Sequence, residues 1–378
     1  MSVFLILTSL SFIDFSSDKK AYYQILCINL NLYNNAFTGK DYNYYNGKYL
    51  NKEDKETFLK LIPKEGLKLS GEAFLSFLSI SYNFWNFSGS FNLRTKGKIE
   101  KEIFELLLFG NKLNQIYQLK ESKGELFTFS QFKNTFNFYF KRNWQLGLGI
   151  SYLKGHYYFK TENNYLTLLT TQNFLNLYNE INYQRSLGGQ GFGFDIGFGK
   201  RVKENLVFKI IMENLGNKIF WQKENKIGKI ILIIDSLNFS KINAGNYYSF
   251  MKEEKETIGF VNNPLPMKIN LFLENKIKDY LKIKPSISWA INEFFKFSFE
   301  SYYQPFNFLW IINSLNLYLL SSKNTSLENF SSEIGIGLGI TIKRFDFLVF
   351  QEYYKGFLLN AKGFYFKLSF GYNFSINS

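Results

Sequence analysis

The strongest constraint on the fold is an uninterrupted alternation of large apolar and small residues between Gly191 and Gly199. Glycines and Asp195 occupy one set of positions, and the positions between them hold Phe192, Phe194, Ile196 and Phe198. Successive side chains of a β-strand point to opposite faces, so one face of this strand is wholly apolar and the other is small and charged. After a polar turn the chain returns in a second alternating run. We interpret the pair as a hairpin of a transmembrane β-barrel, with the apolar face toward lipid and the small face toward a lumen.

The same alternation recurs along the rest of the chain. Phe136 and Phe138 alternate with polar residues, and residues 334–341 alternate isoleucine or leucine with glycine or threonine. Counting such runs predicts an all-β fold, a transmembrane antiparallel barrel of about 14 strands, within the even-numbered range of outer-membrane barrels. The chain ends on a strand of the form that the barrel-assembly machinery recognises, with its apolar positions at Phe364, Phe366, Leu368, Phe370, Tyr372 and Phe374.

Composition agrees with a barrel and argues against other classes. Aromatic residues make up 20% of the 378 residues, and aromatic side chains form the girdles of membrane barrels. No apolar run after the N-terminus approaches the roughly 20 residues of a spanning helix. The net charge of +14 comes from basic residues spread along the chain, which argues against a nucleic-acid partner. A soluble all-β protein stays open, because alternation alone does not exclude it.

Two segments break the alternation and predict short helices in loops or in a plug. The first runs from Asn51 to Ile62, begins at an asparagine N-cap and stops before Pro63. The second runs from Ile99 to Phe109 and stops before a glycine, a residue that suits the end of a helix. Residues 219–240 are poorly patterned, and residues 241–256 predict a long extracellular loop.

The N-terminal residues predict export. Residues 1–17 contain an apolar core of the length found in signal peptides, without a basic start or a clear cleavage site, so we expect a degenerate signal segment. Residues 18–378 are expected to form a single outer-membrane barrel domain. The expected location is the bacterial outer membrane, with outer-membrane lipids and the barrel-assembly machinery as partners.

The sequence predicts no enzyme. Cys27 and His156 are the only residues of their kinds, which excludes a disulfide and any triad or zinc site built from several such residues. We therefore expect no catalytic residue, no metal site and no cofactor. Acidic residues of neighbouring strands, such as Asp195 and Glu213, lack the nucleophile and base that an outer-membrane hydrolase needs.

The alternation also predicts which side chains face the lumen and which face lipid. A carboxylate facing lipid is costly, so we expect Asp195 to face the lumen, paired with Lys209 or Arg201. The full set of expected lumen residues is Asp195, Lys209, Glu213 and Arg94. The expected lipid-facing residues are Phe192, Phe194, Ile196, Phe198, Phe136 and Phe138.

Short segments at residues 50–55, 62–67, 105–111 and 152–155, and the pair 193–197 and 213–216, together resemble a bacterial family of unknown function related to FadL-like and PorV-like outer-membrane barrels. Such proteins carry an Asn-Pro-Ala segment near the N-terminus that contributes to a plug, and this chain has Asn-Pro only at residues 263–264.

The resemblance to FadL-like barrels and the resemblance to PorV-like barrels imply different functions. The FadL-like side implies a channel for hydrophobic or small solutes, with a hydrophobic small molecule as cargo. The PorV-like side implies a structural or scaffold barrel that serves secretion or surface partners. A continuous polar lumen would favour the channel, and a lumen packed shut by the two predicted helices would favour the scaffold.

Overall fold

The chain forms a closed antiparallel β-barrel of 14 strands. The computed structural model describes residues 20–82, 84–140, 143–238, 251–257, 261–291, 293–320, 330–342 and 344–375, so the predicted signal segment lies outside the described residues. Each barrel strand pairs with the next, and the last pairs with the first, which confirms the predicted fold class. The barrel strands are β1 (Lys20–Asn34), β2 (Leu67–Tyr82), β3 (Trp85–Ile99), β5 (Lys123–Phe140), β6 (Trp144–Thr170), β8 (Gly188–Lys203), β9 (Leu206–Leu215), β14 (Lys268–Lys278), β15 (Leu281–Ala290), β16 (Phe294–Phe306), β17 (Leu309–Leu320), β18 (Phe330–Ile342), β19 (Phe345–Tyr354) and β20 (Gly363–Ser375).

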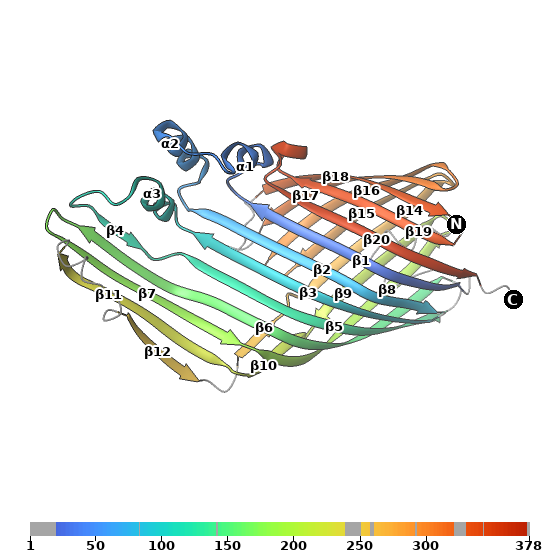
Figure 1. The fold of residues 1–378 in the computed structure, drawn as a ribbon. Helices are drawn as coiled ribbons and strands as arrows, with labels where there is room; N and C mark the ends of the chain where they lie inside the picture. Colours follow the sequence, from blue (N-terminus) through green and yellow to red (C-terminus); the bar gives the residue numbers. More distant parts are fainter. Residues whose placement is uncertain are drawn as a thin grey trace.

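The two ends of the barrel differ in their connections. Figure 1 shows β1 beginning and β20 ending at one end of the barrel. At that end the strands are joined by short turns, such as residues 204–205 between β8 and β9 and residues 279–280 between β14 and β15. The long excursions, residues 35–66, 100–122 and 216–267, all leave from the opposite end. Short turns on one side and long loops on the other are typical of outer-membrane barrels.

The predicted helices lie in these long loops, and there are three of them rather than two in the described residues. They are α1 (Gly39–Tyr45), α2 (Lys52–Leu61) and α3 (Lys101–Phe109), and a 3-10 turn, η4 (Leu358–Asn360), contacts α1. Figure 1 shows the helices beyond the end of the strands. The prediction missed α1, whose capping box at Thr38 and Asp41 lies in a Tyr- and Asn-rich stretch of weak helix formers. None of these helices is long and apolar enough to cross a membrane.

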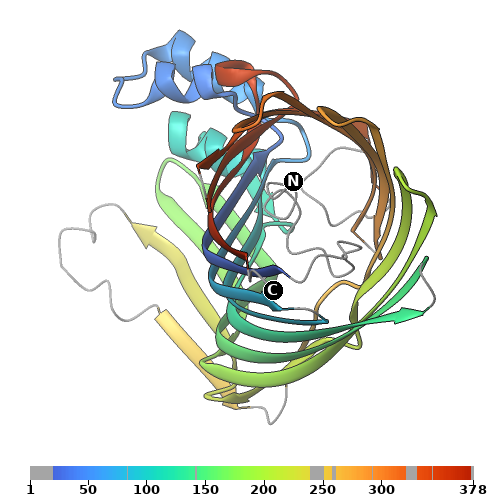
Figure 2. The ribbon, with the colours of Figure 1, turned by 90° about the vertical axis from the view of Figure 1, so that its right-hand side faces the viewer.

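A second sheet branches from the barrel wall at the long strand β6. The first half of β6 pairs with β8, and its second half pairs with β7 (Phe174–Ser186). Beyond β7 come β11 (Lys226–Asn238) and β12 (Met251–Thr257), while β4 (Ile116–Leu119) pairs with the far end of β6. We call β4, β7, β11 and β12 the wing; Figure 2 shows its yellow strands β11 and β12 standing apart from the closed barrel.

The wing corrects two predictions about the middle of the chain. The poorly patterned residues 219–240 contain β11 and a short strand, β10 (Lys218–Lys223). The predicted loop of residues 241–256 contains β12 in its described part. The sequence of β11 interrupts a run of isoleucines with lysines and glycine, and the sequence of β12 is largely charged. Neither has the clean alternation of a membrane strand, so the pattern misled the prediction.

Strand β10 lies against the inner face of the barrel wall, where it pairs with β8 and with β13 (Val261–Pro264). Ile219 and Trp221 of β10 are fully buried in a cluster with Phe129, Leu153 and other wall residues. Glycines make this approach feasible: a Cβ at Gly191 would collide with the carbonyl of Lys218. The backbone of β10 therefore lies directly on the glycine face of β8. Glycine in a strand often marks such a close approach of another backbone.

Candidate functional site

The barrel encloses a cavity of about 690 Å³ with many charged residues in its lining. Its lining includes eight lysine or arginine side chains and six glutamates: Arg94, Lys96, Lys133, Lys209, Lys268, Lys284, Lys296 and Lys367, with Glu72, Glu213, Glu274, Glu293, Glu300 and Glu352. A smaller cavity of about 260 Å³ shares many of these residues and adds Asp195. No residue of the three helices lines either cavity, so the helices do not fill the described lumen.

The four side chains that the sequence predicted on the lumen side all line these cavities. Arg94, Lys209 and Glu213 line the larger one and Asp195 the smaller one. Asp195 is only 4% exposed and accepts a hydrogen bond from the backbone N–H of Asn214 at 2.7 Å. Alternation along the strand places these polar groups away from the outer surface.

The predicted partner of Asp195 was wrong. Its carboxylate pairs with Lys133 of β5, at 2.7 Å from Nζ to Oδ2, whereas Lys209 pairs with Glu274 at 3.2 Å. Strand β6 separates β5 from β8, and Gly149 of β6 lies level with Asp195. The glycine leaves the space that the long lysine side chain needs to reach across a whole strand. Such a contact between second neighbours in the sheet cannot be found by looking for charges on adjacent strands.

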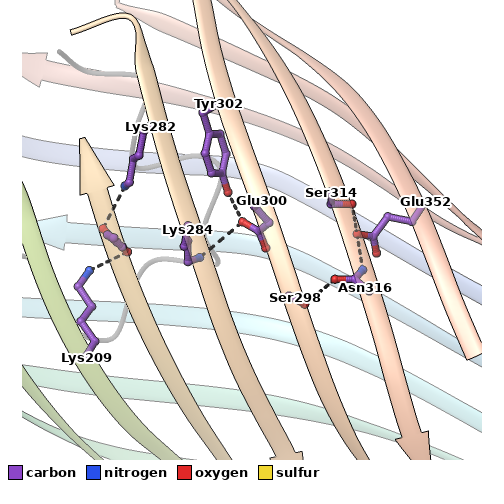
Figure 3. Close-up of polar contacts among 10 residues, drawn as sticks. Lys209, Lys282, Lys284, Ser298, Glu300, Tyr302, Ser314, Asn316 and Glu352 are labelled. Atoms are coloured by element: carbon purple, nitrogen blue, oxygen red, sulfur yellow. Dashed lines mark hydrogen bonds and ion pairs between the residues drawn. The ribbon is translucent and has the colours of Figure 1, made fainter. Parts of the chain in front are cut away.

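A network of charges follows the inner wall from β9 to β16. Glu274 of β14 binds Lys209 on one side and Lys282 on the other, at 3.2 and 3.0 Å. On the next strands Lys284 lies 3.7 Å from Glu300, which also accepts a hydrogen bond from Tyr302. Figure 3 shows Lys284 and Tyr302 pointing toward Glu300 from neighbouring positions on the wall. Paired in this way, the charges are held on the wall at positions that can still be hydrated from the cavity.

The wall from β16 to β19 carries two glutamates, Glu333 and Glu352, that are held by neutral donors. Glu352 accepts hydrogen bonds from Ser314 and Asn316 at 2.7 and 2.8 Å, and Asn316 continues the chain of contacts to Ser298 (Figure 3). Glu333 Oε2 accepts a hydrogen bond from the hydroxyl of Tyr318 at 2.8 Å. In the described part of the chain neither glutamate has a lysine or arginine within 4.0 Å. The charges of the lumen are therefore paired with one another on one wall, and these two glutamates are bound by neutral donors on the adjoining wall.

Two contacts narrow the lumen. Lys96 of β3 binds Glu293, in the turn between β15 and β16, at 2.7 Å; these strands lie on opposite sides of the ring of 14. Near the chain termini, buried Tyr22, Trp310 and Leu348 form an apolar cluster on the inner face. The ion pair spans the lumen at the end that carries the long loops, and the cluster thickens the wall at the other end.

The outward residues include the predicted aromatic set. Phe192, Phe194, Ile196, Phe198 and Phe138 are 38–61% exposed, and Phe136 is partly exposed. In β20, the side chains from Phe364 to Tyr372 at alternate positions are partly buried and Phe374 is exposed. β20 pairs along its length with both β19 and β1, so this strand closes the barrel.

The structure brings together one pair that the sequence did not predict. Ser130 Oγ lies 2.8 Å from Nε2 of His156, which a bulge between β5 and β6 turns toward it. Serine and histidine recur in hydrolases with a third group on the other ring nitrogen. Among the described residues no carboxylate or amide bonds that nitrogen, and no group of three His, Cys, Asp or Glu side chains could hold a metal. The pair alone does not form a catalytic triad.

The fold is similar to that of several solved structures. The structure matches a Pseudomonas aeruginosa FadL homologue with TM-score 0.52 at 12% identity, covering 94% of this chain and 90% of that one. It matches the P. putida toluene transporter TodX with TM-score 0.54 at 9% identity, covering 97% and 94%. At these identities the likenesses show the barrel fold alone. No curated protein matches the sequence.

The match to a family model covers nearly the whole barrel. It extends from residue 15 to residue 351, from just before β1 into β19. This agrees with the resemblance that the short segments between residues 50 and 216 indicate. The chain belongs to DUF5723, a family of unknown function.

Proposed function

We propose that this protein is a channel of the bacterial outer membrane that passes small polar solutes. The observation that carries the proposal is the cavity of about 690 Å³ lined by ionised side chains inside a closed barrel. Charged groups that line a lumen are characteristic of water-filled barrels. The apolar outer face and the unequal loops support the membrane location.

The charged lining supports a polar rather than a hydrophobic cargo. A hydrocarbon in this cavity would displace water from lysines and glutamates without replacing its hydrogen bonds, at a cost of several kcal/mol for each buried charge. A small hydrophilic solute can exchange hydrogen bonds with the same groups. We therefore favour polar over hydrophobic cargo, and we propose no enzymatic activity, because within the described residues the Ser130–His156 pair has no orienting group.

Planar-bilayer conductance of the purified full-length protein tests the channel. We expect single-channel steps, with heat-modifiable migration on a gel as evidence of a closed barrel. Glu293→Gln should increase the conductance, because it removes the ion pair that crosses the lumen. Asp279→Asn removes an equally short ion pair with Lys276 on an exposed turn and should leave the conductance unchanged. A folded barrel that gives no conductance steps would contradict the proposed channel function.

A scaffold barrel is the second candidate, and the wing favours it. Strand β12 pairs with β11 on one side, and an edge strand can add a strand from another chain. Deletion of residues 226–257 separates the two functions. Loss of a surface or secreted partner with conductance retained would support a scaffold role, and loss of conductance alone would support the channel.

A further inference from the structure

The cavity contains a lysine whose charge no carboxylate balances by direct contact. Lys367 of β20 is 7% exposed and lines the cavity. Within the described residues no aspartate or glutamate oxygen lies within 4.0 Å of its ammonium group, although Lys284, Glu300 and Glu352 act on it from farther away. A buried cation is costly unless it is paired, so this position is suited to an anion that enters from the lumen.

A second polar group beside it also lacks a partner. Asn31 of β1 lines both cavities, and its side-chain oxygen is buried without a hydrogen-bond donor. The amide nitrogen of Asn31 is used, because it bonds to Glu72. An orphaned acceptor costs free energy that a ligand hydroxyl can recover.

The strand register places these two groups close together. Asn31 lies directly opposite Tyr365, and Asn29 lies opposite Lys367 two residues along. Asn31 and Lys367 are therefore diagonal neighbours on one face of an antiparallel pair, with backbone positions about 7–8 Å apart. Asn29, Tyr365 and Lys284 line the same cavity and add donors around the gap.

We propose that Lys367 and Asn31 form a binding subsite for a small hydroxycarboxylate, with the carboxylate on the lysine and a hydroxyl donating to the asparagine oxygen. This inference rests on the proposed channel and specifies its solute. The nearby Glu300 and Glu352 disfavour a phosphate or other dianion, because each added negative charge is repelled by both glutamates. A single carboxylate matches the single positive charge of Lys367, the buried lysine of this position.

Binding of three six-carbon probes to the detergent-solubilised full-length protein, measured by titration calorimetry, tests the subsite. Gluconate carries a carboxylate and hydroxyls, hexanoate only the carboxylate, and glucose only hydroxyls. We expect gluconate to bind most tightly. Lys367→Gln should weaken gluconate and hexanoate by about tenfold or more, the loss typical of a charged hydrogen bond. Asn31→Ala should weaken gluconate but not hexanoate.

Lys203→Gln is the matched control, because it removes one lysine charge at the exposed end of β8, outside the cavity. Heat-modifiable migration of every variant verifies that the barrel is closed. Unchanged gluconate affinity in Lys367→Gln, or equal binding of glucose and gluconate, overturns the subsite. Conductance without gluconate binding overturns the subsite and keeps the channel, whereas gluconate binding without conductance keeps the subsite and overturns the channel.

Discussion

At the scale of single residues, the stability of a buried charge in the lumen depends on its ion-pair partner as well as on the strand that carries it. Asp195 and Lys133 face each other across β6, and the aspartate is almost completely buried. Asp195→Asn should lower the free energy of unfolding by about 1–3 kcal/mol, because Lys133 loses its nearer carboxylate and keeps only Glu213 at 4.0 Å, and because Asn214 loses a charged acceptor. Urea unfolding in lipid bilayers, followed by gel migration, measures the change.

The control for this substitution is Asp279→Asn. Asp279 pairs with Lys276 at the same 2.7 Å but its side chain is 98% exposed, so an effect of at most about 0.5 kcal/mol is expected. Equal effects of the two substitutions would mean that the lumen solvates charges as well as the surface does.

At the scale of elements, the glycine face of β8 determines where β10 lies. Gly191→Ala should displace β10 from the inner wall, since the new methyl group would occupy the position of the Lys218 carbonyl oxygen. We expect a loss of about 1–3 kcal/mol, as for other overpacked sites. The fluorescence of Trp221, buried beside β8, should shift toward that of an exposed indole.

Gly339→Ala is the matched control on β18. The nearest atom to a Cβ there is 3.5 Å away, an ordinary contact, so stability and fluorescence should stay those of the parent protein. If Gly191→Ala behaves in the same way, β10 does not pack against β8 as described.

At the scale of the whole molecule, the apolar side chains exposed on the outer face are the ones that would contact lipid in the proposed membrane location. Phe194 is 55% exposed near the middle of β8. Phe194→Arg should cost about 2–4 kcal/mol of insertion free energy if this position lies near the bilayer midplane, whereas Phe140→Arg, at the turn end of β5, should cost only about 0–1 kcal/mol. Folding into vesicles, measured by heat-modifiable migration, compares the two. Equal insertion would contradict an outward belt in contact with lipid.

Much of this architecture follows from local pattern. The side-chain period of two predicted the fold class, the strand number, the lumen positions of Asp195 and Glu213 and the outward position of Phe194. It did so because the direction of a side chain in a strand depends only on its position along that strand. The helix α2 was predicted for a similar reason, because its capping box lies within a few residues.

Only the tertiary structure decided which groups meet. The pairing of Lys133 with Asp195, the ion pair of Lys96 with Glu293 and the placement of β10 on the inner wall all join strands that are not adjacent in the sequence pattern. These contacts depend on barrel closure and on the space that glycines leave, which no local period encodes. The sequence by itself determined a membrane-type barrel with a polar interior, and the closed structure decided which of the charges in that interior are paired.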